Sequence, residues 1–129
     1  CNTKLPRNIF PQGCLASRSA EAAGLLGGEA GYWKMHDWLM KNQSGFGYDA
    51  ARRAARTLGL ESDRFVASLE DARVAQAIQN DIDAAEAVRV DQIPKIYIQG
   101  KWVRTWTREG DNVLERIADK VAKEASGAK

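Results

Sequence analysis

The sequence predicts an α-rich α/β fold, on three observations. Four or five segments of helical composition come first in the chain of 129 residues. Two short runs rich in β-branched and aromatic residues follow, separated by Gln99-Gly100, and this pattern indicates an antiparallel hairpin. An amphipathic segment then closes the chain. Because a two-stranded hairpin is only marginally stable in water, we expect it to pack on the helices or to pair with strands that this chain does not contain.

The helical part is bounded by residues that favour helix ends. Gly27 and Gly28 are expected to end the first helix, and Gly59 the third. Ser62 and Asp71 are expected to cap the two helices that they precede, because short polar side chains accept hydrogen bonds from free backbone amides. The helices are therefore expected at residues 14–26, 30–41, 48–58, 62–69 and 71–88.

Apolar side chains recur at helical spacing, and this spacing predicts which faces are buried. The longest expected helix carries the clearest pattern, and the second and third helices carry shorter ones. The expected core-facing residues are Tyr32, Met35, Leu39, Tyr48, Ala51, Ala55, Leu58, Val74, Ile78, Ile82 and Ala85.

The last forty residues have a different pattern. Strands are expected at residues 93–98 and 101–106, and the alternation of the second strand puts Trp102 and Trp106 on one face. A final helix is expected over residues 111–124, followed by a frayed tail. Residues 1–13 contain two of the three prolines and show no period, so we expect an irregular segment there.

The composition is that of an ordinary globular domain. Hydrophobic residues make up 44% of the chain and charged residues 28%, and the formal net charge is +2. A chain of this length can bury a real core without help from disulfides. Nothing in the charge pattern indicates a nucleic-acid partner, and the apolar runs are too short to span a membrane. We expect no metal and no cofactor, since His36 is the single histidine.

Cys1 and Cys14 are the two cysteines, with twelve residues between them. That spacing does not fit a CxxC redox pair or a zinc site. It favours a structural disulfide, which would contribute roughly 3 kcal/mol in the chain-entropy model. Two free thiols, or a reactive Cys14 at the start of a helix, remain alternatives. A catalytic role for His36 is less favoured than a packed side chain, because nothing in the sequence links it to either cysteine.

Several motifs follow one another in a specific order over nearly all of the chain. They are Phe10-Pro11-Gln12-Gly13-Cys14, Ala20-Glu21-Ala22-Ala23-Gly24, Tyr32-Trp33-Lys34-Met35-His36-Asp37 and Val90-Asp91-Gln92-Ile93-Pro94-Lys95-Ile96-Tyr97-Ile98. In this order they resemble the DsbA-like branch of the thioredoxin superfamily. The resemblance is closest to the bacterial group that also occurs fused to vitamin K epoxide reductase-type membrane domains.

The resemblance implies a thiol:disulfide oxidoreductase of the periplasm or another extracytoplasmic compartment. It implies that Pro94 is the family's cis-proline, and that Ile93, Pro94 and Lys95 line the groove for an extended polypeptide. The sequence departs from the family pattern at Ile93, where Thr or Val is frequent, and at Lys95, where a small residue is usual. In active relatives a strand and a helix with the CxxC pair come before this region, and this chain has neither. We therefore expect the isolated chain to be inactive in thiol–disulfide exchange.

The expected organisation is one partial thioredoxin-like domain over residues 1–129, with a helical subdomain at 14–89 and a strand-turn-strand-helix unit at 90–125. A redox-inactive thioredoxin-like module that binds or scaffolds a protein partner is the alternative function. The short sheet also predicts that the hairpin edge near Ile96 and Tyr97 pairs with another chain, which could be a second copy of this one.

Overall fold

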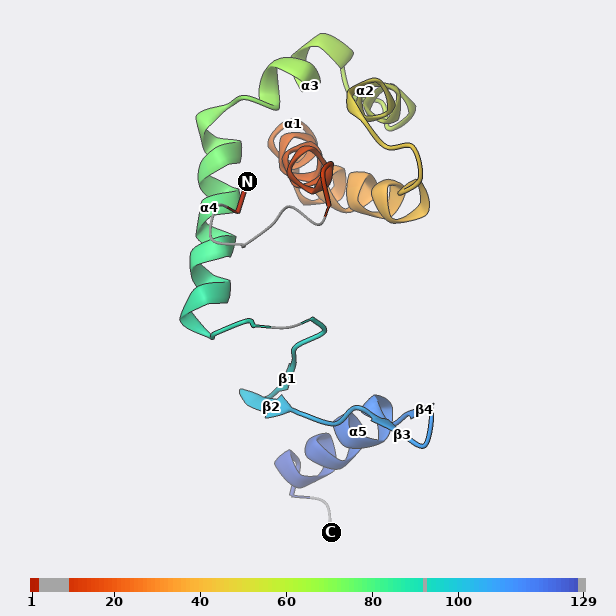
Figure 1. Cartoon of the computed structure of the whole chain (residues 1–129), viewed down its shortest axis with the longest axis vertical. Coiled ribbons are helices and arrows are strands. Elements are labelled where there is room, and N and C mark those ends of the chain that lie inside the picture. Colours follow the sequence, from red (N-terminus) through yellow and green to blue (C-terminus); the bar gives the residue numbers. More distant parts are fainter. Residues whose placement is uncertain (3–9, 92, 128–129) are drawn as a thin grey trace. The chain divides into compact units, whose positions relative to one another are not determined.

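The computed structural model describes residues 1–2, 10–91 and 93–127, and the chain divides into two compact units, Cys1–Ala87 and Val88–Lys129 (Figure 1). Each unit is described by itself below. Most of the irregular segment expected before Cys14 lies outside the described residues, as do Gln92 of the quoted motif and the end of the expected tail.

The first unit is built from four helices, α1 (Gly13–Lys41), α2 (Tyr48–Thr57), α3 (Ser62–Ser68) and α4 (Ala72–Ala87). Helix α1 combines the first two predicted helices, which meet without a loop at Gly28. The backbone of Gly28 has φ 64° and ψ −163°, a conformation that glycine adopts at low cost. The glycine pair therefore changes the direction of the chain at the predicted position, and the second helical segment starts at once.

Gly31 lies where the two segments of α1 come very close to each other. A Cβ atom at this position would lie 2.4 Å from the carbonyl oxygen of Ala23, a backbone atom that cannot move aside without shifting the helix. Gly24 is also closely packed, since a Cβ atom at this position would lie 3.2 Å from the Cβ atom of Tyr32. The small residues of α1 thus let its two segments pack at short range.

Gly31→Ala is expected to destabilise the first unit by about 1–3 kcal/mol, because the added methyl group forces the two segments of α1 apart. Gly27→Ala in the same helix is the matched control. Its Cβ would meet Leu60 at an ordinary 3.5 Å, and alanine favours helix over glycine by up to about 1 kcal/mol. Urea unfolding of the full chain measures both changes. Equal midpoints for the two variants would contradict the close approach.

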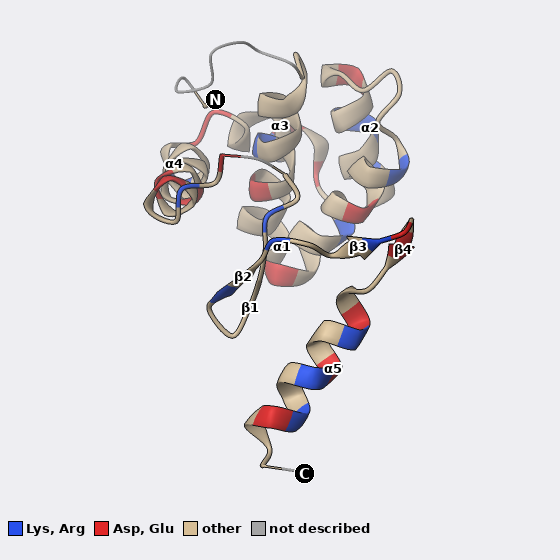
Figure 2. Ribbon diagram, turned by 60° about the horizontal axis from the view of Figure 1, so that its bottom comes forward, with Lys and Arg blue, Asp and Glu red and all other residues tan. Residues whose placement is uncertain are grey.

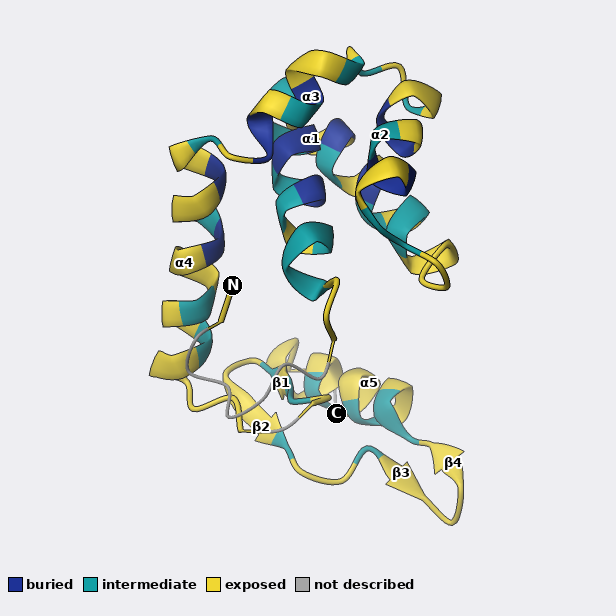
Figure 3. Ribbon diagram, turned by 45° about the horizontal axis from the view of Figure 1, so that its top comes forward, coloured by how far each residue is buried: buried dark blue, intermediate teal, exposed yellow. Residues whose placement is uncertain are grey.

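The core of the first unit combines many alanines with a few large side chains. Small residues of α1 and α2 are fully buried, and Phe65 of α3 and Met35 of α1 are the two largest fully buried side chains. Figure 3 shows this buried surface on the helices of the first unit. The buried cluster consists of Ala22, Ala23, Met35, Ala51, Ala54, Ala55, Phe65, Leu69, Val74 and Ile78. The prediction is confirmed for Met35, Val74 and Ile78. It is wrong for Tyr48, which is 50% exposed because the buried face of α2 is formed by its alanines.

The helix caps of the first unit differ in part from those predicted. Asp71 accepts a hydrogen bond of 2.8 Å from the backbone amide of Arg73, so it caps α4 as predicted. Hydrogen bonds from the Arg73 side chain lower the pKa of Asp71 to about 2. The prediction for Ser62 is wrong by one position. Glu61 caps α3, and its carboxylate oxygens accept from the amides of Asp63 at 2.9 Å and Arg64 at 2.7 Å. These backbone hydrogen bonds lower the pKa of Glu61.

The second unit contains two small hairpins and a helix. Strands β1 (Ile96–Ile98) and β2 (Lys101–Val103) are antiparallel, with Tyr97 opposite Trp102. Strands β3 (Thr107–Arg108) and β4 (Asp111–Asn112) form a second hairpin that was not predicted, and α5 (Leu114–Ala125) follows. The predicted strands at 93–98 and 101–106 were too long, and the last helix begins at Leu114 rather than at 111 because Asp111 and Asn112 pair with β3.

Both hairpins turn on two residues with positive φ. Gln99 and Gly100 have φ of 49° and 74°, and Glu109 and Gly110 have φ of 54° and 89°. Two successive residues with positive φ are typical of the hairpin turns whose twist matches the right-handed twist of the paired strands. The helices with these small antiparallel hairpins confirm the predicted α-rich α/β class.

None of the described residues of the second unit is buried, so Figure 3 shows no dark blue on it. Charged residues of both signs are spread along α5 (Figure 2). The apolar side of α5 carries Leu114, Ile117 and Val121, which are only partly covered, as is Val113 directly before the helix. This unit therefore has amphipathic elements but no closed core of its own within the described residues.

Candidate functional site

The loop that precedes β1 carries the predicted groove residues Ile93, Pro94 and Lys95. The Ile93–Pro94 peptide bond is cis. The side chain of Ile93 is 82% exposed, the highest value among the exposed large hydrophobic residues of the described chain. Pro94 is exposed as well. The two residues therefore present an apolar surface to solvent directly before the first strand.

Lys95 is oriented differently from its two neighbours. Its side chain is only 7% exposed, an unusual value for a lysine. The ammonium group donates to the carbonyl oxygen of Arg89 and, at 3.0 Å, to the Oδ1 atom of Asp91. It also lies 4.7 Å from the centre of the Trp102 ring, in a cation–π contact. The hydrogen bond from Lys95 lowers the pKa of Asp91.

Tyr97, like Lys95, makes a side-chain hydrogen bond to a backbone carbonyl group of residues 88–91. Its hydroxyl donates a hydrogen bond of 3.2 Å to the carbonyl oxygen of Val88. Directly after β2, the Arg104 guanidinium lies 4.9 Å from the centre of the Trp102 ring. Residues 88–91 are thus joined to the first hairpin through side chains that point back to them.

Exposed apolar side chains gather on the same part of the chain. Besides Ile93, the large hydrophobic residues of the second unit that remain exposed are Val88, Val90, Tyr97 and Trp102. In addition, β1 pairs with β2 and with no other strand of the described residues, so its second edge has free backbone groups. The segment therefore offers apolar surface to an extended polypeptide, and the open edge of β1 offers backbone groups to another strand.

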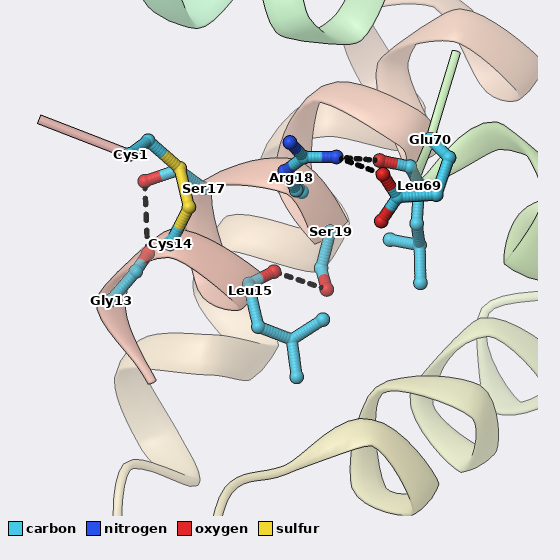
Figure 4. Close-up of a disulfide and its surroundings, with 9 residues drawn as sticks. All are labelled: Cys1, Gly13, Cys14, Leu15, Ser17, Arg18, Ser19, Leu69 and Glu70. Atoms are coloured by element: carbon cyan, nitrogen blue, oxygen red, sulfur yellow. Dashed lines mark hydrogen bonds and ion pairs between the residues drawn. A yellow bond between two sulfur atoms is a disulfide. The ribbon is translucent and has the colours of Figure 1, made fainter. Parts of the chain in front are cut away.

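The two cysteines lie in the first unit, where Cys1 and Cys14 form a disulfide with their Cα atoms 5.0 Å apart (Figure 4). Cys14 is in the first turn of α1, next to Gly13, whose carbonyl oxygen accepts a hydrogen bond of 3.1 Å from Ser17. Neither cysteine is free. The cysteine pair and the Pro94 loop belong to different units of the chain.

Arg18 was not singled out from the sequence. It donates at 2.8 Å to the carbonyl oxygen of Leu69 and at 2.8 Å to the Glu70 carboxylate, at the end of α3 (Figure 4). These hydrogen bonds tie α1 to the end of α3. The sequence holds no local signal for them, because Arg18 and its partners are about fifty residues apart.

His36 lies among aromatic side chains. Its ring is stacked at 6.3 Å from that of Tyr32 and is edge-on at 5.3 Å from that of Trp33. The buried Nδ1 atom has no hydrogen-bond partner among the described residues and lies 3.6 Å from the Asp37 carboxylate. These contacts suit the packed side chain that the sequence favoured over a catalytic one.

Other kinds of site find less support. Within the described residues no group of three or more His, Cys, Asp or Glu side chains is arranged to hold a metal ion. No described helix combines the length and the apolar character needed to cross a membrane. A concave surface of the second unit lies between the second hairpin and α5, and it does not include the Pro94 loop. Its lining residues are Arg108, Glu109, Asp111, Val113, Arg116, Ile117, Lys120, Val121 and Glu124.

Comparison with known proteins gives matches to one family model and to long transporters. The model of the DSBA-like thioredoxin domain matches residues 6–122. The chain is similar to the Na(+)/H(+) antiporters NhaA 3 of Salinispora tropica and NhaA 1 of Salinispora arenicola, with 34% and 33% identity over 94 residues. The antiporter NhaA of Herminiimonas arsenicoxydans is 28% identical over the same length.

Each of these alignments covers 73% of this chain, but only 14–15% of the antiporter. The chain therefore spans about one seventh of the curated relatives that it matches. No solved structure matches. The family model covers most of the chain, in agreement with the sequence motifs and the α-rich α/β architecture. The chain belongs to the DSBA-like thioredoxin domain family.

Proposed function

We propose that this chain is part of a thiol:disulfide oxidoreductase, in which Ile93, Pro94 and Lys95 form one side of the groove for an extended polypeptide substrate. Membership of the DSBA-like family supports the class of reaction. The catalytic CxxC pair is not in this chain, because its two cysteines are 13 positions apart and bonded to each other. The isolated chain therefore binds substrate without exchanging disulfides.

The exposure of Ile93 is the observation that carries this proposal. Ile93 is 82% exposed, so this large apolar residue contributes little to the packing of its own unit. Such a side chain contributes free energy when a partner covers it, at about 25 cal/mol per Å² of apolar surface buried. The backbone beside it can pair with an extended chain, as in strand addition. Side-chain contact and backbone pairing would then act together at residues 93–95.

The chemistry of the whole enzyme is thiol–disulfide exchange. A thiolate attacks one sulfur of a disulfide, the original S–S bond breaks, the other sulfur leaves as a thiolate, and a mixed disulfide between enzyme and substrate is formed. The residues of this chain hold the polypeptide extended beside the reacting sulfur atoms and supply no thiol. Because the groove recognises backbone and apolar surface, it accepts many sequences. The substrate class is therefore unfolded or extended polypeptide.

The proposed compartment is extracytoplasmic, such as the periplasm, which suits both the family and the disulfide of this chain. The three relatives are named as Na(+)/H(+) antiporters. We therefore place the function of this chain at a membrane, as one domain of a longer protein. The open edge of β1 would then pair with strands of the same protein or with a second copy of this chain.

Ile93→Asp is expected to weaken polypeptide binding at least tenfold, because a charge would be placed where the substrate must exclude water. Fluorescence anisotropy measures this with fluorescein-labelled insulin B chain whose cysteines are alkylated, added to the full chain. Met40→Asp is the matched control, since Met40 is 59% exposed but belongs to the first unit. Equal affinities for wild type and Ile93→Asp would show that the groove lies elsewhere, and no binding by the wild type would refute the proposed function.

A further inference from the structure

Residues 88–91 are held to the first hairpin by the side chains of Lys95 and Tyr97, which we call the latch. The Lys95 ammonium binds the carbonyl oxygen of Arg89 and the carboxylate of Asp91. The Tyr97 hydroxyl binds the carbonyl oxygen of Val88. Two consecutive backbone carbonyls are therefore each held by a side chain from the start of the hairpin.

The spacing of the two residues explains how the latch is formed. Residues two positions apart in an extended chain direct their side chains to the same face, so Lys95 and Tyr97 act side by side. The register puts Trp102 opposite Tyr97, and its ring lies 4.7 Å from the Lys95 ammonium. The ammonium thus has a carbonyl, a carboxylate and an aromatic face as its neighbours.

The low exposure of Lys95 separates its role from that of Ile93. A lysine side chain that is 7% exposed and has these three partners offers no free charge to a ligand. Losing the ammonium would leave the Arg89 carbonyl and the Asp91 carboxylate without this donor, and the segment before Pro94 would lose its attachment. By contrast, Ile93 and Pro94 are exposed to solvent. Their position depends on the residues that anchor both sides of the loop.

We propose that Lys95 and Tyr97 are positioning residues for polypeptide binding, because they hold residues 88–91 so that Ile93 and Pro94 are presented in one arrangement. The inference rests on the proposed function of the loop. A loop that is already ordered loses less conformational entropy on binding than a loop that becomes ordered only when the ligand binds. The latch therefore raises affinity for an extended polypeptide by ordering the loop that carries Ile93 and Pro94.

The first experiment measures the contact itself. The pKa of the Asp91 carboxyl group is followed by NMR in the full chain, in the wild type and in Lys95→Met. Lys95 lowers this pKa, so it is expected to rise towards its ordinary value of about 3.9 in the variant. Lys101→Met is the control, since Lys101 is an exposed lysine of the same hairpin. An unchanged Asp91 pKa in Lys95→Met would overturn the latch, whether or not polypeptide binds.

The second experiment measures positioning with the labelled, alkylated insulin B chain. Lys95→Met and Tyr97→Phe are expected to weaken its binding about tenfold, and Lys95→Arg is expected to restore most of the affinity because it keeps the charge and the donors. Lys101→Met should bind as the wild type does. Unchanged affinity in Lys95→Met and Tyr97→Phe, with the Asp91 pKa shifted, would overturn the positioning role and leave the groove intact. No binding by the wild type would refute both the proposed function and the positioning role. The pKa of Asp91 would still show whether the contacts of the latch exist.

Discussion

Phe65→Ala is expected to destabilise the first unit by about 3–5 kcal/mol. Phe65 is fully buried and belongs to a core in which half of the clustered residues are alanines. Small neighbours on two helices cannot move inward to fill the volume of a lost aromatic ring, so the substitution leaves a cavity. Since whole domains are stable by only about 5–15 kcal/mol, the variant loses much of the stability of this unit.

Urea unfolding of the full chain, followed by far-UV circular dichroism, measures this effect through the helices of the first unit. Tyr48→Ala is the matched control, because it removes an aromatic ring that is 50% exposed on the same unit. The control is expected to change stability by less than about 1 kcal/mol. If Phe65→Ala unfolded at the same urea concentration as Tyr48→Ala, the described core would be wrong.

The double substitution Cys1→Ser and Cys14→Ser is expected to cost roughly 3 kcal/mol of stability in the first unit. The disulfide closes a loop of 13 positions, and the cost is the chain entropy that the unfolded state regains when the loop opens. We propose on this basis that the bond is structural. Thermal unfolding of the wild type without reductant, of the wild type with reductant and of the double variant measures the cost.

The same measurement has an internal control. Reductant should lower the midpoint of the wild type to that of the double variant and leave the double variant unchanged. A double variant as stable as the oxidised wild type would contradict a structural role. The two cysteines would then need another explanation, such as the reactive Cys14 that the sequence left open.

The helical part was largely predictable because its signals are local. The spacing of Met35, Val74 and Ile78 defines buried faces, and the glycine pair at Gly27 and Gly28 marks the change of direction in α1. The cap at Glu61 was missed because Ser62 is the stronger cap former by residue type. The buried alanines of α2 were only partly recognised. Alanine is weakly apolar, so the large side chain of Tyr48 dominated the apolar pattern of this helix.

The second unit was harder to predict, because its strands are shorter than the runs of β-favouring residues that contain them. Residues after Val103 have strand-like composition, but the chain turns instead into a second hairpin at Glu109-Gly110. That hairpin is closed by a hydrogen bond of 2.9 Å from the amide of Val113 to the carbonyl oxygen of Trp106. The Glu-Gly pair was the available signal, and its resemblance to the Gln99-Gly100 turn could have revealed it.

The residues of the candidate site could be predicted from the sequence, but the directions of their side chains could not. The motif around Pro94 located Ile93, Pro94 and Lys95. It did not show that Ile93 is open to solvent while Lys95 turns back to Arg89 and Asp91. This direction depends on backbone geometry, including φ of 54° at Arg89, which residue types alone do not specify. Tyr97 was missed as a site residue for the same reason.

The central claim is that the Pro94 loop is the part of this chain that meets an extended polypeptide. The most direct test is an NMR titration of the ¹⁵N-labelled full chain with alkylated insulin B chain. The account predicts the largest, saturable shifts at the backbone amides of Ile93 and Lys95, with small changes in the four helices of the first unit. Shifts confined to those helices, shifts at Ile96–Ile98 without Ile93 and Lys95, or no shifts at millimolar peptide would contradict it.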